Sequence, residues 1–146
     1  MIEEAMRLYP PAATLTREAI EPDVLAGRRI KKGMRIVVSP FVVHRHRLLW
    51  RDPDLFMPER FLGEAREEID RFAYLPFGAG PRVCVGASFA LQEACIVLAH
   101  IVQAFRFEHV ETHEVRPVQR VTLRPKDGMP MRIFALPDAS GGVSPG

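Results

Sequence analysis

One of the chain's two cysteines, Cys84, lies in the glycine-rich segment FGAGPRVCVG, residues 77–86, directly ahead of a long apolar run. A cysteine thiolate is a soft ligand that suits iron, and it binds a metal only when it is deprotonated. The glycines allow backbone conformations that leave N–H groups free to face the sulfur, and Arg82 adds a positive charge two residues away. A helix starting after the loop would direct its N-terminal dipole toward the same sulfur. The segment can therefore hold an iron-ligating thiolate.

The same loop also fits a simpler interpretation. A free cysteine is commonly a small buried hydrophobic residue, and glycine-rich turns frequently precede helices. The chemistry of the loop alone therefore leaves two roles open for Cys84, a packed turn residue and an iron ligand. The spacing of the other residues in the loop has to decide between them.

That spacing resembles the haem-binding signature of the cytochrome P450 family. The segment reads Phe77-x-x-Gly80-x-Arg82-x-Cys84-x-Gly86, and every fixed position is filled. The resemblance implies that Cys84 is the proximal ligand of haem iron, with heme b (iron protoporphyrin IX) as the cofactor. It also implies that Phe77 packs beside the thiolate, that Arg82 pairs with a haem propionate, and that Gly80 and Gly86 shape the turn.

A second motif lies near the N-terminus, in EAMRLYPP. Glu4 and Arg7 are three residues apart, so they share one helix face and can form an ion pair. An isolated surface pair of this kind contributes little to stability. The family, however, has a Glu-x-x-Arg helix followed by prolines, and its PERF motif occurs here at residues 58–61. The resemblance implies a structural triad of Glu4, Arg7 and Arg60 that supports the cysteine pocket.

The resemblance implies further site residues around the haem and the substrate. Arg17, in the strand after the prolines, is expected to bind a second propionate, and an ordinary exposed strand arginine is the alternative. The segment that would lie beside the substrate consists of Ala12, Ala13, Thr14 and Leu15. These small, mostly apolar side chains suit a small apolar organic substrate. Another substrate contact is expected around residues 117–119.

The histidines and the second cysteine are interpreted as structural. His44 and His46 have a two-residue spacing that could suit a metal, but no carboxylate or third ligand accompanies them, so surface or loop packing is predicted. Cys95 and His100 lie in the apolar run, where core packing is predicted for the thiol and local hydrogen bonding for the imidazole.

Composition limits the classes of protein to consider. The 146 residues are 47% hydrophobic, with a formal net charge of +2 from interspersed charges, so a folded core is expected and nucleic acid is excluded as a partner. Two cysteines form neither a disulfide framework nor a zinc-finger pattern, which favours an intracellular protein. The N-terminus is not a signal peptide, and no apolar run of about 18 residues indicates a membrane segment.

The predicted fold class is α+β, mainly α. It corresponds to the C-terminal part of the cytochrome P450 fold, in one domain over residues 1–138 that is truncated at its N-terminus, with a flexible tail at 139–146. The expected elements are a helix over 1–9 ended by Pro10 and Pro11, a small sheet in 12–40, a long ordered loop with one or two short helices in 41–76, a buried helix over about 86–105, and short antiparallel strands thereafter.

The resemblance implies a haem-thiolate monooxygenase that inserts one oxygen atom of O₂ into an organic substrate. Electrons would come from a ferredoxin or a flavoprotein reductase, which is expected to dock on a basic face. That face consists of Arg60, Arg66, Arg71 and Arg82, and a solvated loop of mixed charge is the alternative. A bacterial, soluble type in the cytoplasm is expected, and an anchor upstream of Met1 is left open.

The family's distal acid-threonine pair is not found in this sequence. No catalytic residue is therefore assigned, and the chain by itself is expected to be inactive. The alternative function is that of a non-catalytic, truncated haem-binding fragment or remnant.

Overall fold

The structure is a computed structural model that describes residues 1–137, and the tail predicted at 139–146 lies outside the described residues. The chain divides into two compact units. The first contains Met1–Cys84 and Gln119–Leu123, and the second contains Val85–Val118 and the described residues from Arg124 onward. A single domain over 1–138 stays a prediction, and each unit is described by itself.

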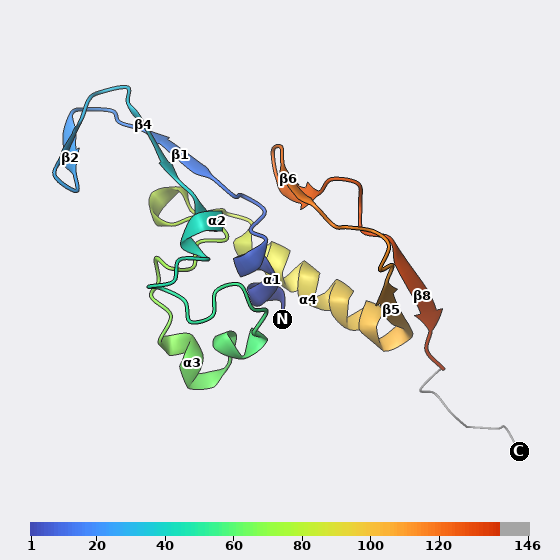
Figure 1. Cartoon of the computed structure of the whole chain (residues 1–146). Coiled ribbons are helices and arrows are strands. Elements are labelled where there is room, and N and C mark those ends of the chain that lie inside the picture. Colours follow the sequence, from blue (N-terminus) through green and yellow to red (C-terminus); the bar gives the residue numbers. More distant parts are fainter. Residues whose placement is uncertain (138–146) are drawn as a thin grey trace, which may run out of the picture. The chain divides into compact units, whose positions relative to one another are not determined.

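Helix α1 (Ile2–Leu8) is the first element of the first unit (Figure 1). It ends at Tyr9, whose backbone leaves the helical region with φ −128° and ψ 67°, because a residue that precedes proline is disfavoured in helical geometry. Glu4, Arg7 and Leu8 are its buried residues and share one face through their three- and four-residue spacing. The helix therefore turns an ion pair inward.

Two antiparallel ribbons follow α1, which confirms strands in residues 12–40. Their strands are β1 (Leu15–Glu18) paired with β4 (Arg35–Val38), and β2 (Asp23–Leu25) paired with β3 (Arg28–Ile30). The turn between β2 and β3 has positive φ at both central residues, Ala26 (48°) and Gly27 (77°). Turns of this hand match the twist of a hairpin. In the other ribbon, Leu15 lies opposite Val38, so β1 begins at the last residue of the predicted substrate-side segment.

The long segment before the cysteine loop contains little regular structure. Its short helices are α2 (Pro40–Val43), η1 (Pro58–Phe61) and α3 (Gly63–Glu67). A compact cluster of Trp50, Phe61 and Ala73 holds the segment together, and Tyr74 packs against it with its ring centroid 4.8 Å from that of Phe61. Aromatic rings bury much apolar area for few residues, so this cluster accounts for an ordered loop.

The second unit is built on helix α4 (Ala87–Ala104), which continues directly into strand β5 (Phe105–His109). Strand β5 pairs antiparallel with β8 (Met131–Ala135). The short strands β6 (Pro117–Gln119) and β7 (Leu123–Pro125), at the two ends of the stretch Gln119–Leu123 that is assigned to the first unit, pair with each other. Helices together with small antiparallel sheets confirm the predicted α+β class.

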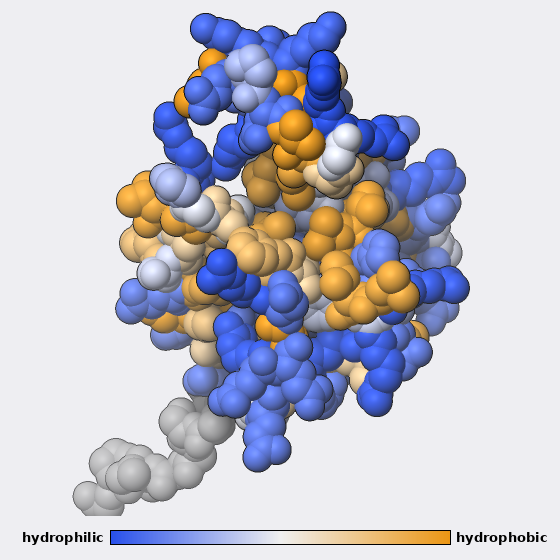
Figure 2. Space-filling view, turned by 90° about the vertical axis from the view of Figure 1, so that its left-hand side faces the viewer, coloured by the Kyte–Doolittle hydropathy of each residue, from blue (hydrophilic) through white to orange (hydrophobic). Residues whose placement is uncertain are grey.

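The predicted burial of α4, and with it the predicted core packing of Cys95, is wrong for the described residues. No residue of α4 is buried, and Phe89 is 70% exposed. Its own unit places mainly β5 against it, whereas a helix that is apolar all round needs surfaces on several sides. Hydrophobic residues also lie among the charged ones on the face of the molecule that Figure 2 presents. The 18 residues of α4 also have a mean hydropathy of 1.4, enough by length and composition to cross a membrane, because Glu93 is their one charged residue. Core helices of soluble proteins meet the same criterion, so this observation is weak.

Candidate functional site

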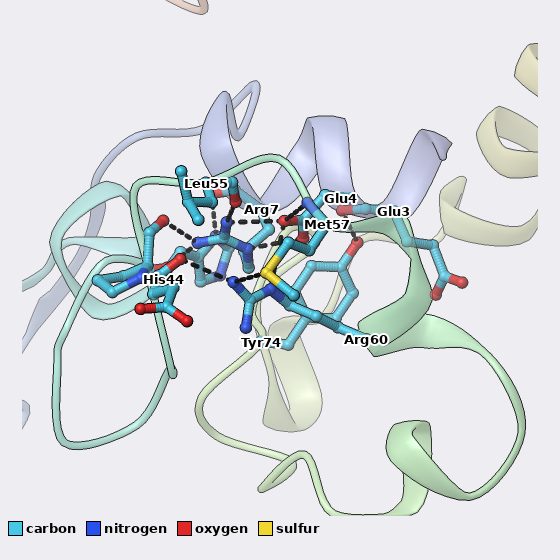
Figure 3. Close-up of polar contacts among 10 residues, drawn as sticks. Glu3, Glu4, Arg7, His44, Leu55, Met57, Arg60 and Tyr74 are labelled. Carbon is cyan, nitrogen blue, oxygen red and sulfur yellow. Dashed lines mark hydrogen bonds and ion pairs between the residues drawn. The ribbon is translucent and has the colours of Figure 1, made fainter.

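The buried guanidinium of Arg7 is the centre of the first unit's polar network (Figure 3). It donates to both carboxylate oxygens of Glu4, from Nε to Oε2 at 2.7 Å and from Nη2 to Oε1 at 2.8 Å. Its remaining donors reach three backbone carbonyl oxygens, those of His44 (2.8 Å), Pro53 (2.7 Å) and Leu55 (2.9 Å). All five N–H groups of the side chain are therefore used.

The structure also brings Arg60 to Glu4. Arg60 Nε lies 3.4 Å from Glu4 Oε1 as an ion pair without hydrogen-bond geometry, and its Nη2 donates to the carbonyl of Asp52 at 2.7 Å. The backbone N–H of Met57 donates to Glu4 Oε1 at 2.8 Å. Burial raises the pKa of Glu4, but the hydrogen bonds from Arg7 and Met57 and the charges of both arginines outweigh it and hold that pKa below its ordinary value. Glu4 therefore stays ionised.

His44 is a member of this network that sequence reasoning missed. Its ring is fully buried, with Nδ1 3.0 Å from the carbonyl oxygen of Arg7 and Nε2 2.7 Å from the backbone nitrogen of Leu75. Burial, followed by the charges of Arg7 and Arg45, lowers the pKa of His44 from 6.5 to about 4, although hydrogen bonds to the backbone oppose the shift. His46, in contrast, is exposed. The only sequence signal for burial was the apolar stretch that precedes His44.

The cysteine loop is closed by backbone contacts. The N–H of Cys84 donates to the carbonyl of Phe77 at 2.9 Å, and the N–H of Val83 donates to that of Gly80 at 3.0 Å. Gly78 and Gly80 have φ angles of 77° and 73°, a region that residues with a Cβ rarely adopt. Both glycines are therefore required by the backbone path of the loop.

The other predicted residues of the loop have different environments. Cys84 and Arg82 are exposed, and Phe77 is half-buried. Gly86 precedes α4, and its carbonyl accepts the N–H of Ala90 at 2.9 Å. Its φ of −87° is open to any residue, so conformation alone does not explain a glycine there. The loop thus presents a free thiol and a cation on its surface.

The predicted substrate-side segment lies against the loop at one point. A Cβ built on Gly78 would lie 3.6 Å from Leu15 Cδ1, an ordinary van der Waals distance. Thr14 Oγ1 accepts from Gln119 Nε2 at 3.1 Å, so Gln119, one of the residues where a further substrate contact is predicted, bonds to this segment. Ala13 is buried and Ala12 is half-buried.

Arg17 is exposed on β1, and its guanidinium donates to the adjacent carbonyl of Thr16 at 2.9 Å. This contact is local to the strand, so it does not bring Arg17 to the cysteine loop. Among residues 1–137, no group of three or more His, Cys, Asp and Glu side chains could hold a metal ion. Within the described part of the chain, Cys84 is therefore not part of a cluster of protein metal ligands.

The profile of the family described as Cytochrome P450 matches residues 1–130. The chain belongs to the cytochrome P450 family. It is 39% identical over 137 residues to cyclooctatin synthase from Streptomyces melanosporofaciens, covering 94% of this chain and 29% of that protein. It is 40% identical over 136 residues to thromboxane-A synthase from Sus scrofa, covering 91% of this chain and 25% of that protein. The chain thus spans under a third of the length of these curated P450 relatives.

Solved P450 structures share the fold. The crystal structure of the cytochrome P450DA heme domain matches with a TM-score of 0.86 and 31% identity, covering 93% of this chain and 30% of that one. Family membership implies a haem cofactor, and the loop fits one. A lone exposed thiol is sufficient protein ligation when a macrocycle supplies the other donors, and a glycine-rich backbone allows a flat partner to approach.

Proposed function

We propose that this chain is the haem-binding part of a haem-thiolate monooxygenase, with Cys84 as the proximal ligand of heme b. The observation that carries the proposal is an exposed Cys84 at the end of a backbone-closed loop in a P450-family chain. The bound haem supplies O₂ activation and oxygen-atom transfer, for which thiolate ligation provides electron density. This chain's residues hold and orient the group.

Different loop residues are proposed to hold different parts of the haem. Half-buried Phe77 covers one side of the thiolate, and Gly80 and Gly86 set the turn before α4. Exposed Arg82 is free to turn toward a propionate and form charge-assisted hydrogen bonds. Arg17 is proposed to bind the second propionate, which requires its guanidinium to exchange the carbonyl of Thr16 for the carboxylate.

The substrate is proposed to be a small apolar organic molecule that contacts Ala12, Ala13, Thr14 and Leu15. The closeness of the Leu15 side chain to Gly78 supports the proposed substrate side, because it brings apolar carbon near the loop that would hold the haem. Gln119, which donates to Thr14, would fix that segment's polar group and leave the apolar carbons to the substrate.

An electron-donor protein, a ferredoxin or a flavoprotein reductase, is proposed to dock on the exposed arginines Arg66, Arg71 and Arg82. Arg60 contributes less to such a face, since its side chain is 11% exposed and is paired with Glu4. Arg66 is partly neutralised by Glu3, 2.6 Å from its Nη1. A cytoplasmic location is proposed with this soluble electron donor.

The second candidate is a haem-binding fragment without turnover. The length of the match favours this candidate, because the chain spans 25% to 29% of the two curated relatives described above. In addition, no distal acid-threonine pair is assigned in its sequence. Under this alternative Cys84 still binds haem iron. The two candidates therefore differ in turnover and agree on the ligand.

Haem titration of the chain tests the ligand. The unmodified chain, reduced and treated with CO, is expected to give the Soret band of thiolate-ligated haem, and Cys84→Ala is expected to abolish it, since no other described thiol lies in the loop. Cys95→Ala is the matched control, because Cys95 is also an exposed thiol but belongs to α4, and it should leave the band intact. A band that survives Cys84→Ala would contradict the assignment.

A further inference from the structure

We infer that His44 is a positioning residue that ties helix α1 to the chain entering the cysteine loop, through opposite nitrogens of one imidazole ring. This inference rests on the proposed role of Cys84 and deepens it, because it names what holds the start of that loop in place.

The first half of the link joins His44 to the end of α1. The Nδ1 atom of His44 lies 3.0 Å from the carbonyl oxygen of Arg7, while Arg7 Nη1 donates to the carbonyl oxygen of His44 at 2.8 Å. Both residues are fully buried, so water cannot replace either contact. The two hydrogen bonds fix the ring of His44 relative to the helix.

The second half joins His44 to the loop. His44 Nε2 accepts the backbone N–H of Leu75 at 2.7 Å. Leu75 is separated from Phe77 only by the buried Pro76, and the carbonyl of Phe77 accepts the N–H of Cys84 at 2.9 Å. Proline fixes its own φ, so the path from Leu75 to Phe77 has little freedom. Displacing Leu75 therefore displaces the acceptor that closes the loop at Cys84.

Only one form of the ring makes both contacts. A backbone N–H is a donor, so Nε2 must carry a lone pair, and the carbonyl of Arg7 is an acceptor, so Nδ1 must carry the hydrogen. Protonation of Nε2 would place its N–H opposite the backbone N–H of Leu75, and the hydrogen bond between them would be lost. The charged and titratable groups around the ring are Arg7 from α1, Arg45 from its own segment and Tyr74 from the segment of Leu75, with ring centroids of His44 and Tyr74 5.4 Å apart. The arginines favour the neutral ring, in agreement with the geometry.

Three variants of the full chain separate the two contacts. His44→Gln can place an acceptor oxygen near the position of Nε2 and accept from Leu75. His44→Asn keeps a donor near Nδ1 for the carbonyl of Arg7 but is too short for Leu75, and His44→Phe lacks both. His46→Gln is the matched control, because His46 is exposed and lies two residues away.

Amide hydrogen exchange in the haem-free chain is the primary measurement. Exchange at Leu75 and Cys84 is expected to accelerate about tenfold in His44→Asn and His44→Phe, less in His44→Gln, and not in His46→Gln, because one buried hydrogen bond is lost. Ala73, whose N–H donates to Asp70, is the internal reference for the same unit. Unchanged exchange at Leu75 and Cys84, or equal acceleration at Ala73, would overturn the inference.

A second experiment, which measures the thiolate Soret band of the haem-loaded variants, distinguishes this inference from the proposed function. His44→Phe should reduce the fraction of haem with the thiolate Soret band, and His44→Gln should restore most of it. Cys84→Ala should abolish the band without changing exchange at Leu75, since Cys84 does not contact His44. If the unmodified chain shows no thiolate band, the ligand assignment fails while the exchange result still decides the role of His44.

Discussion

Arg7→Met is expected to lower the free energy of unfolding by about 3 to 5 kcal/mol. The substitution keeps an unbranched, apolar chain of moderate length but removes every donor. It leaves the Glu4 carboxylate without its closest cation and strips hydrogen bonds from the buried carbonyls of His44 and Pro53 and the part-buried carbonyl of Leu55. Since small domains are stable by only about 5 to 15 kcal/mol, the loss is a large share of the total. Denaturant unfolding followed by circular dichroism measures it.

The matched control is Arg66→Met, because Arg66 also pairs with a glutamate of α1. That pair, with Glu3, is solvent-exposed, with 52% of the Arg66 side chain accessible. Exposed ion pairs are worth about 0 to 1 kcal/mol, so this variant should unfold close to the unmodified chain. If the two variants lost equal stability, the buried network would not be the main source of order in the first unit.

Acid is expected to destabilise the first unit before the Glu4 carboxylate, whose pKa is lowered, is protonated. His44 has a pKa of about 4 when folded and 6.5 ordinarily, so the unfolded chain binds a proton between these values and the folded chain does not. The contribution of the neutral His44 ring to the free energy of unfolding is fully present above pH 6.5. It falls by about 3 kcal/mol in total as the pH drops toward 4. The lowered pKa of Glu4 adds a further loss, which begins below its ordinary value of 4.5.

Unfolding free energies measured from pH 7 to pH 4.5 test this slope. His44→Gln should flatten it, because an amide does not titrate, whereas His46→Gln should leave it unchanged. An identical slope in His44→Gln would show that another group dominates acid sensitivity. The measurement is made on the haem-free chain, so protonation of a ligand cannot contribute.

Local sequence signals predicted the parts of the structure that depend on near neighbours. The three-residue spacing of Glu4 and Arg7, with prolines after it, indicated a helix with a charged face, and turn residues such as Gly27 indicated the ribbons. The family motif placed Arg60 with Glu4, and the structure has them in contact. Spacing along a helix fixes which side chains share a face, so the Glu4–Arg7 pair followed from local geometry, whereas the place of Arg60 came from the resemblance to the family.

Contacts between distant residues were harder to predict. His44 bonds to Arg7 and Leu75, which are 37 and 31 positions away, and only the apolar residues before His44 distinguish it from exposed His46. The prediction that α4 is buried was wrong for a related reason. An apolar sequence shows that a helix prefers to be covered, but coverage depends on surfaces that its own residues do not encode.

The five donors of Arg7 also have a consequence for how the chain folds. Three of them satisfy carbonyls at residues 44, 53 and 55, groups that in regular structure would bond within a helix or a strand ladder. The Arg7 guanidinium thus supplies hydrogen bonds to carbonyl groups of an irregular segment, which in a helix or a sheet would come from backbone N–H groups. Because these bonds span 37 to 48 positions, the segment must close a long chain loop before it gains them, and we therefore expect it to become ordered only when α1 docks.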